Sequence, residues 1–422
     1  MKRIFFLLFF VWFYKPFSCR AYSVLTHEAL IDASWKDYLK PLLLKKYPSA
    51  TEKELKLAHA YAYGGCIMPD MGYYPFGNKF FTDLTHYVRS GDFINALFDE
   101  VENINDYAFS LGALCHYFAD SYGHSSGINL IVPMVYEKDF KKYGHSVTYE
   151  EDKIAHLRVE FSFDVLQTAR GNYASEDYHD LIGFKVSVPV IEKAFIKTYG
   201  LKLQDLIPNL GNAIETFRWA VKTLIPEATK IAWSIKKSDI RKQQPLMTEK
   251  KFIYHVDRTD YIKEYGKNYE RPGFVSGFMS LIIRVFPKIG PLKTLKFHVP
   301  NPEEEKVFLN SFDSVLTRYT RFVKQFSSPG LNLTNINYDT RQISVHCEYG
   351  LADETYARLL GRLKEKGFST LTVSLKNNII SYYAGFYSLN KGRNLSKNCK
   401  TLQNSIQELQ NTRPPKIENG NN

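Results

Sequence analysis

The chain has 422 residues, of which 44% are apolar and 23% are charged, and its formal net charge is +11. This composition excludes an intrinsically disordered chain, a collagen-like fibre and a long coiled coil. The basic balance favours anionic partners such as phosphates, membrane surfaces or nucleic acid, although it says nothing about the fold.

The first residues have the pattern of a cleaved export signal. A short basic start precedes the apolar run Ile4–Phe13, which as a helix would span only about 15 Å, or about half of a bilayer core. Small residues at Cys19 and Ala21 suit a cleavage site, so we predict a signal peptide over residues 1–21 and Tyr22 as the first mature residue. The mature protein is then secreted or periplasmic; an uncleaved anchor and a lipid on Cys19 are the alternatives.

Residues 22–237 are predicted to form a mainly all-α bundle, because apolar residues recur at helical spacing and alternating strand patterns are nearly absent. Thr51 and Glu54 have the spacing of a capping box at a helix start. The stretch Gly64–Phe80 is rich in Gly, Pro, Met and aromatic residues, and we predict a long loop there. The predicted helices cover Ala29–Lys45, Thr51–Tyr63, Phe93–Val101, Asp106–Tyr122, Asp152–Ala169, Glu192–Thr198 and Leu210–Ile235.

The second half of the chain offers no recognisable chemistry. Residues 252–389 are predicted to be a mixed, mostly helical C-terminal region of unknown role, with helices over Pro302–Phe326 and Ala352–Lys366 and a short strand over Leu371–Leu375. Residues 390–422 are polar and poor in aromatics, so we predict a mobile tail.

Four cysteines follow the predicted signal, and in an oxidising compartment they allow three disulfide pairings, among which the sequence does not choose. Buried thiols are an equally good interpretation for the first two. The four are Cys66, Cys115, Cys347 and Cys399.

Histidine and carboxylate side chains recur at intervals of four residues in two predicted helices. His116, Asp120 and His124 form one row, and His156 and Glu160 form another. Side chains four residues apart on a helix face the same way, with a drift of about 40° per step, so the longer row suits two adjacent metal sites with a shared central carboxylate. Further candidate donors lie nearer the amino terminus: His27, Asp70 and His86. Nitrogen and carboxylate donors with few thiols nearby suit zinc.

These donors, in this order, resemble the metal ligands of the zinc-dependent phospholipase C family and of the single-strand-specific nucleases that share its trinuclear site. In that family the amino-terminal residue is itself a zinc ligand and a histidine follows it. Tyr22 and His27 stand at those places here, although family members usually begin with Trp. The resemblance covers residues 22–235 and implies up to three zinc ions per chain.

The resemblance also implies how the donors divide among the metals. Asp120 would bridge two of them, and a hydroxide between two zinc ions would be the nucleophile. Asp70 would act as a general base, as a ligand, or as both. The three implied ligand groups are Asp70, His86, His116 and Asp120; His124, His156 and Glu160; and the Tyr22 backbone, His27 and Asp120.

We therefore expect an extracytoplasmic zinc-dependent phosphodiester hydrolase, most simply a phospholipase C that hydrolyses phospholipids with a zinc-bound hydroxide. Peripheral contact with a membrane surface is compatible with this function, and the sequence has no specific nucleic-acid motif. A single-strand-specific nuclease on the same site and a non-catalytic zinc-stabilised binding protein are the alternatives.

The sequence does not identify the phospholipid headgroup. In choline-specific members aromatic residues stand near the places of Met71 and Asp83, and nearby aromatics could replace them or simply pack in the loop. These aromatics are Tyr73, Tyr74, Phe76, Phe80 and Phe81. The histidines without a partner at metal spacing are predicted to be structural: His59, His145, His179, His255, His298 and His346.

Overall fold

The computed structural model describes residues 24–169 apart from Pro75, then 184–218, 298–326, 331–386 and 397–415, with a few single residues between 233 and 248. Within these ranges the elements are helices and no β-strand occurs, which confirms the all-α prediction. The predicted signal peptide and Tyr22 lie outside the described residues. So does most of the predicted helix Leu210–Ile235, of which 210–218 are described and helical.

The described part of the chain begins with three helical segments that follow one another without a break. They are α2 (Val24–Ser34), the π-helical turn η1 (Trp35–Leu39) and α3 (Lys40–Lys46). Helix α4 (Glu52–Ile67) then starts with the predicted capping box. Thr51 Oγ1 accepts from the Glu54 backbone N–H, and the Glu54 carboxylate accepts from the Thr51 N–H at 2.8 Å.

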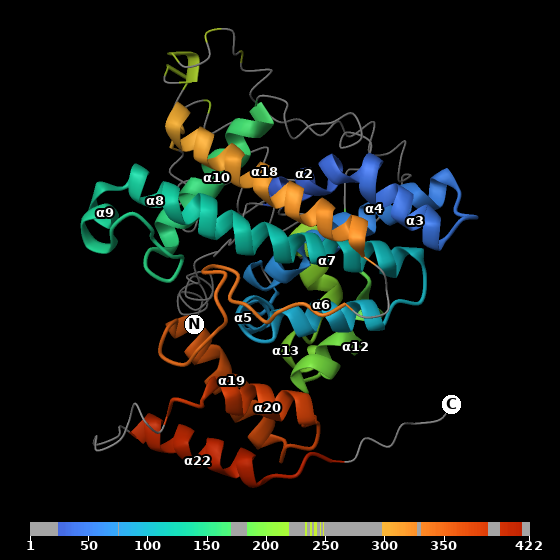
Figure 1. Ribbon diagram of the computed structural model, residues 1–422, viewed down its shortest axis with the longest axis vertical. Coiled ribbons are helices and arrows are strands. Elements are labelled where there is room, and N and C mark those ends of the chain that lie inside the picture. Colours follow the sequence, from blue (N-terminus) through green and yellow to red (C-terminus); the bar gives the residue numbers. More distant parts are fainter. Residues whose placement is uncertain are drawn as a thin grey trace, which may run out of the picture.

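Helices α4 and α7 (Ile104–Gly123) pack closely at the centre of the body (Figure 1). A Cβ atom on Gly65 would overlap the Phe109 carbonyl, and one on Gly112 would overlap the Ala62 carbonyl. Glycine is required at both positions because any side chain would force the two backbones apart.

The predicted loop over Gly64–Phe80 is wrong for most of its length. Helix α4 continues to Ile67, the 3-10 helix η2 (Met68–Tyr73) follows directly, and α5 (Lys79–Tyr87) begins before Phe80. Gly64 serves close backbone packing, because an added Cβ there would overlap the carbonyl of Lys185 in the segment before α12.

The predicted helices Phe93–Val101, Asp152–Ala169 and Glu192–Thr198 are confirmed within a few residues by α6 (Ser90–Asp99), α10 (Lys153–Ala169) and α12 (Val188–Tyr199). Further helical segments of this part were not predicted: the π-helical turn η3 (His124–Ile128), α8 (Asn129–Val135), α9 (Glu137–Tyr143) and α13 (Leu203–Leu206).

Helix α18 (Pro302–Gln325) packs against α7, although it is far away in the sequence (Figure 1). The buried Tyr319 hydroxyl donates to the Leu111 carbonyl at 2.9 Å. The predicted helix Pro302–Phe326 is thereby confirmed, and it belongs to the same hydrophobic core as the first half.

Helices α19 (Gly350–Glu365), α20 (Val373–Tyr382) and α22 (Lys397–Asn411) gather at one end of the molecule (Figure 1). Helix α19 packs on α5. The strand predicted over Leu371–Leu375 is wrong, because Thr372 accepts from the Leu375 N–H and caps α20.

The polar tail predicted from residue 390 contains an ordered helix. Ile406 and Leu409 of α22 are buried, and α22 contacts both α19 and α20. The low mean hydropathy of α22 obscures a narrow apolar stripe, in which Ile406 and Leu409 are three residues apart. Such a stripe is enough to hold a helix on the surface of a protein.

Cys66 and Cys115 form no disulfide bond in the described part of the chain. Cys66 and Cys115 are buried, as their interpretation as core thiols predicts. Among the described residues, no helix combines the length and the apolar character needed to cross a bilayer.

Candidate metal centre

Four donors from three elements meet near the carboxyl end of α7. His86 Nε2 lies 3.4 Å from Asp70 Oδ1 and 3.2 Å from Asp120 Oδ2. His116 Nε2 lies 3.2 Å from the same Asp120 oxygen and 3.4 Å from His86 Nε2. Tetrahedral zinc with bonds of about 2.0–2.1 Å places its ligand atoms about 3.3 Å apart, so the spacing fits a zinc ion. All four side chains are buried.

Backbone carbonyls orient the two imidazole rings of this group. His116 Nδ1–H donates to the Cys66 carbonyl at 2.7 Å, and His86 Nδ1–H donates to the Thr82 carbonyl at 2.8 Å. A neutral ring that donates from Nδ1 presents a lone pair at Nε2. The two Nε2 atoms therefore face each other and a carboxylate, an arrangement that a shared cation, either a proton or a metal ion, stabilises. Metal-binding histidines make this kind of outer hydrogen bond.

Asp120 lies between two donor groups. Its Oδ1 is 3.1 Å from His27 Nε2 on α2, whereas its Oδ2 faces His86 and His116. The His27 ring stacks on the His116 ring with centroids 4.6 Å apart. His27, His116 and Asp120 are close enough to hold a metal ion together, and Tyr22, which was predicted to complete this group, lies outside the described residues.

Asp164 on α10 fixes the first turn of α2. Its carboxylate accepts from the backbone N–H of Leu25 at 3.0 Å and of Thr26 at 3.1 Å, and from the Thr26 hydroxyl at 2.7 Å. Asp164 lies one helical turn beyond Glu160. The helix that carries metal donors therefore also holds the two residues that precede His27.

We expect Asp164→Ala to lower the free energy of unfolding by about 1.5–3 kcal/mol, since bonds to a buried charge are lost. It should also weaken metal binding at His27. The checks are urea denaturation and the zinc content per chain. Asn103→Ala is the control: it removes the α7 cap formed with the Asn105 and Asp106 N–H groups, at about 1 kcal/mol, and should keep all zinc. Equal zinc loss in both variants would contradict a positioning role for Asp164.

A second donor group begins where α7 widens into the π-helical turn η3, whose first residue is His124. The His124 and His156 rings stack with centroids 5.8 Å apart, and His156 Nδ1 lies 3.7 Å from Glu160 Oε1. His156 Nε2–H donates to the Val147 carbonyl at 2.6 Å, which leaves Nδ1 as the ligand atom. The structure thus brings together the predicted trio His124, His156 and Glu160, all buried.

The charges of the site fit a divalent cation. Burial, and then the carboxylates of Asp120 and Asp70, raise the pKa of Glu160 well above its ordinary value. Burial lowers the pKa of His156 to about 4, so this ring is neutral at pH 7. Although burial opposes it, the adjacent carboxylates of Asp120 and Asp70 raise the pKa of His86 to about 9. Glu160 and His86 thus retain protons that a bound cation would displace.

The C-terminal half reaches the site through the turn 337–341. The Tyr338 ring lies 5.3 Å from the His86 ring and 5.8 Å from the His116 ring, and its backbone N–H donates to the His86 carbonyl at 3.1 Å. Asp339 Oδ1 lies 3.3 Å from His124 Nδ1. Neither residue was predicted to be part of the site, because neither has helical spacing from another donor and no sequence signal marks them.

Three of the aromatic residues considered for headgroup binding contact side chains away from the metal donors, whereas Phe76 is exposed. The Tyr74 ring lies 4.2 Å from Phe217, and the Phe81 ring lies 5.6 Å from Phe195. Phe80 is buried under the Arg358 guanidinium. Asp83 pairs with Lys79, four residues before it. These contacts favour the packing interpretation.

Four of the remaining histidines have structural partners. His59 stacks on Trp35, His145 contacts Phe140, and His298 pairs with Glu304. His346, Cys347 and Asp353 are close enough for a metal, but the Asp353 carboxylate already accepts from the Cys347 N–H and from the Tyr382 hydroxyl. His179 and His255 lie outside the described residues.

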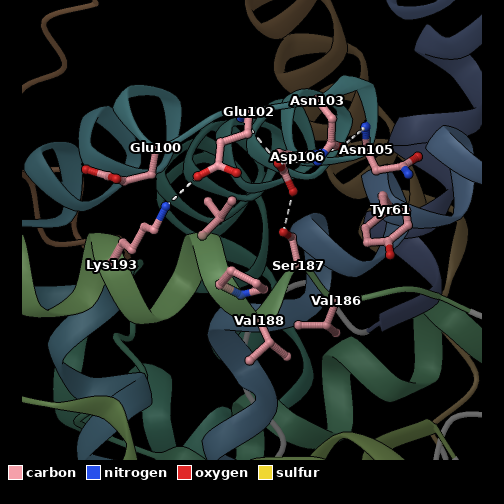
Figure 2. A pocket seen from close by; sticks show the side chains of 12 residues that line it. Tyr61, Glu100, Glu102, Asn103, Asn105, Asp106, Val186, Ser187, Val188 and Lys193 are labelled. Atoms are coloured by element: carbon pink, nitrogen blue, oxygen red, sulfur yellow. Dashed lines mark hydrogen bonds and ion pairs between the residues drawn. The ribbon is translucent and has the colours of Figure 1, made fainter. Parts of the chain in front are cut away.

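A pocket of about 290 Å³ lies between the start of α7 and α12 (Figure 2). Its polar groups serve the fold: Ser187 donates to Asp106 at 2.6 Å, and Lys193 pairs with Glu102 at 2.5 Å. None of the predicted metal ligands lines it.

Residues 26–203 match the family model of zinc dependent phospholipase C. This match supports, over this segment, the resemblance to the zinc-dependent phospholipase C family that was inferred from the sequence. It includes the ligand side chains from His27 to Glu160 and leaves Asp339 outside. No curated protein and no solved structure matches the chain.

Proposed function

We propose that this chain is an extracytoplasmic zinc-dependent hydrolase that cleaves the phosphodiester of phospholipids, as a phospholipase C does. The family match over residues 26–203 supports the class of reaction. The single observation that carries the proposal is the convergence of three buried donor groups, with Asp120 facing His27 through one oxygen and His86 and His116 through the other. The extracytoplasmic location rests on the predicted signal peptide.

The residues would divide among up to three zinc ions in the way the family resemblance implies. Zinc, when bound, supplies a Lewis acid that activates water and stabilises the charge on a phosphodiester. The protein holds these donors in place by hydrogen bonds from the rings of His86, His116 and His156 to backbone carbonyls. The groups are Asp70, His86, His116 and Asp120; His124, His156 and Glu160; and His27 and Asp120 with the Tyr22 backbone.

Asp70 is proposed both as a ligand and as the general base. Both of its carboxylate oxygens are buried and make no hydrogen bond. Oδ1 faces His86, so Oδ2 stays available to accept a proton from the attacking water. A carboxylate with one oxygen bound and one open can fill both roles.

The proposal is tested by offering purified protein three substrates: vesicles of phosphatidylcholine, vesicles of phosphatidylinositol, and single-stranded DNA. We expect release of the phosphorylated headgroup from at least one lipid and loss of this activity in His116→Ala. Hydrolysis of DNA alone would make the protein a nuclease. Full zinc loading with no turnover of any substrate would make it a zinc-stabilised binding protein.

Retention of residues 1–21 should remove the zinc held by His27, because the amine of Tyr22 would then be part of a peptide bond. We expect one zinc fewer per chain and loss of most hydrolysis, measured by metal analysis and lipid turnover. The matched control is the processed protein with an extension of similar length at its C-terminus. Equal zinc content in the two forms would contradict the role of Tyr22.

A further inference from the structure

Asp339 is held firmly beside the second donor group. Its Oδ2 accepts from the Tyr149 backbone N–H and from the Tyr349 hydroxyl, each at 2.8 Å. Its backbone carbonyl accepts from the Asn129 side-chain amide at 3.0 Å. The side chain is buried, and its orientation is fixed by residues from both halves of the chain. These bonds leave Oδ1 as the oxygen that faces His124.

The atoms around Asp339 Oδ1 have the character of metal ligands. They are His124 Nδ1, His156 Nδ1 and Glu160 Oε1, and all four atoms are buried without a hydrogen-bond partner. Buried polar atoms without partners are costly, and four in one donor group call for a shared partner. His124 Nδ1 and Asp339 Oδ1 are 3.3 Å apart, which is about the ligand spacing of tetrahedral zinc.

We propose that Asp339 is the fourth protein ligand of the metal held by His124, His156 and Glu160. This inference rests on the metal centre of the proposed function and deepens it. Four protein ligands close a zinc site, whereas three leave a position open for water or substrate. Closure at this group leaves the groups around Asp120 as the place where a phosphodiester is bound and cleaved.

As a ligand, Asp339 would also link the C-terminal half of the chain to the half that carries the other metal donors. Tyr338 contacts the first donor group while Asp339 contacts the second. Metal binding at the second group would therefore also order the turn 337–341, which is closed by the Arg341 N–H donating to the Asn337 carbonyl at 2.7 Å.

The test compares the zinc content of wild type, Asp339→Asn and Tyr349→Phe, each as the full processed chain titrated with a chelator. In Asp339→Asn the amide oxygen can still accept from Tyr149 and Tyr349, but the NH₂ group cannot bind a metal. We expect it to bind one zinc fewer, or to hold one at least about tenfold more weakly. Tyr349→Phe removes one hydrogen bond to the same carboxylate but keeps Oδ1 as a ligand atom, so it should weaken zinc binding less than Asp339→Asn does.

Hydrogen exchange of wild type provides a second readout that needs no variant. The amides of residues 337–341 should exchange at least about tenfold more slowly with zinc than after its removal. Unchanged exchange, or unchanged zinc affinity in Asp339→Asn, would overturn the inference. Faster lipid hydrolysis by Asp339→Asn at unchanged zinc content would also overturn it, because Asp339 would then block access to the site without binding the metal. A wild type that binds no zinc would overturn the proposed function itself.

Discussion

Replacement of Asp120 by asparagine should cost the protein at least one zinc ion and reduce phosphodiester hydrolysis by at least about 100-fold. Oδ1 of Asp120 faces His27, whereas Oδ2 faces His86 and His116. An amide has one oxygen, so it can serve only one of the two groups, and its NH₂ would face the donor atoms of the other. Metal analysis and lipid turnover of the purified variant measure the effect.

The matched control is Asp106→Asn, another buried carboxylate on α7. Asp106 accepts from the Ser187 hydroxyl and from the Glu102 N–H, at the opposite end of the helix. This variant should lose some stability and keep its zinc. If Asp120→Asn binds as much zinc as Asp106→Asn does, the bridging role of Asp120 is wrong.

Replacement of Gly112 by alanine should lower the free energy of unfolding by about 3 kcal/mol or more, at the upper end of overpacking effects. The added Cβ would overlap the Ala62 carbonyl of α4, and a backbone carbonyl cannot rotate away as a side chain can. Helix α7 carries His116, and helix α4 carries Cys66, whose backbone carbonyl accepts the hydrogen bond that orients the His116 ring. Urea denaturation followed by circular dichroism measures the loss.

Gly361→Ala is the control for this change. Gly361 lies inside α19, and a Cβ there would meet no atom within 4 Å. Alanine should stabilise this helix by about 0.5–1 kcal/mol, because glycine loses more backbone entropy on folding. Opposite signs at the two glycines are the expected result; destabilisation at both positions would contradict the packing argument.

Much of the site could be predicted because its donors lie on helices at regular spacing. His116 and Asp120 share one face of α7, and His156 and Glu160 share one face of α10. Local signals also located the start of α4, where Thr51 and Glu54 form the capping box. These features depend on residues three or four apart, which a sequence displays directly.

The errors arise where the meaning of a residue depends on a distant neighbour. Glycines such as Gly65 suggested a loop, but they serve the contact with α7, which only the folded chain shows. Leu375 was placed in a strand, yet it lies in α20 with Ile379 one turn further, and both are buried. Asp339 lies in a turn that no periodic pattern connects to His124, so its position at the site depends on tertiary structure alone.

The anchoring of α2 by Asp164 makes the metal centre depend on contacts between distant parts of the chain. Leu25 and Asp164 are 139 residues apart, and Tyr149 and Asp339 are 190 apart. Contacts between such distant residues close long loops, and chains that depend on them fold slowly. A growing chain that stops short of residue 164 would contain every predicted donor and still lack the group that holds His27 in place. We therefore expect zinc content to report how completely the chain has been synthesised and folded.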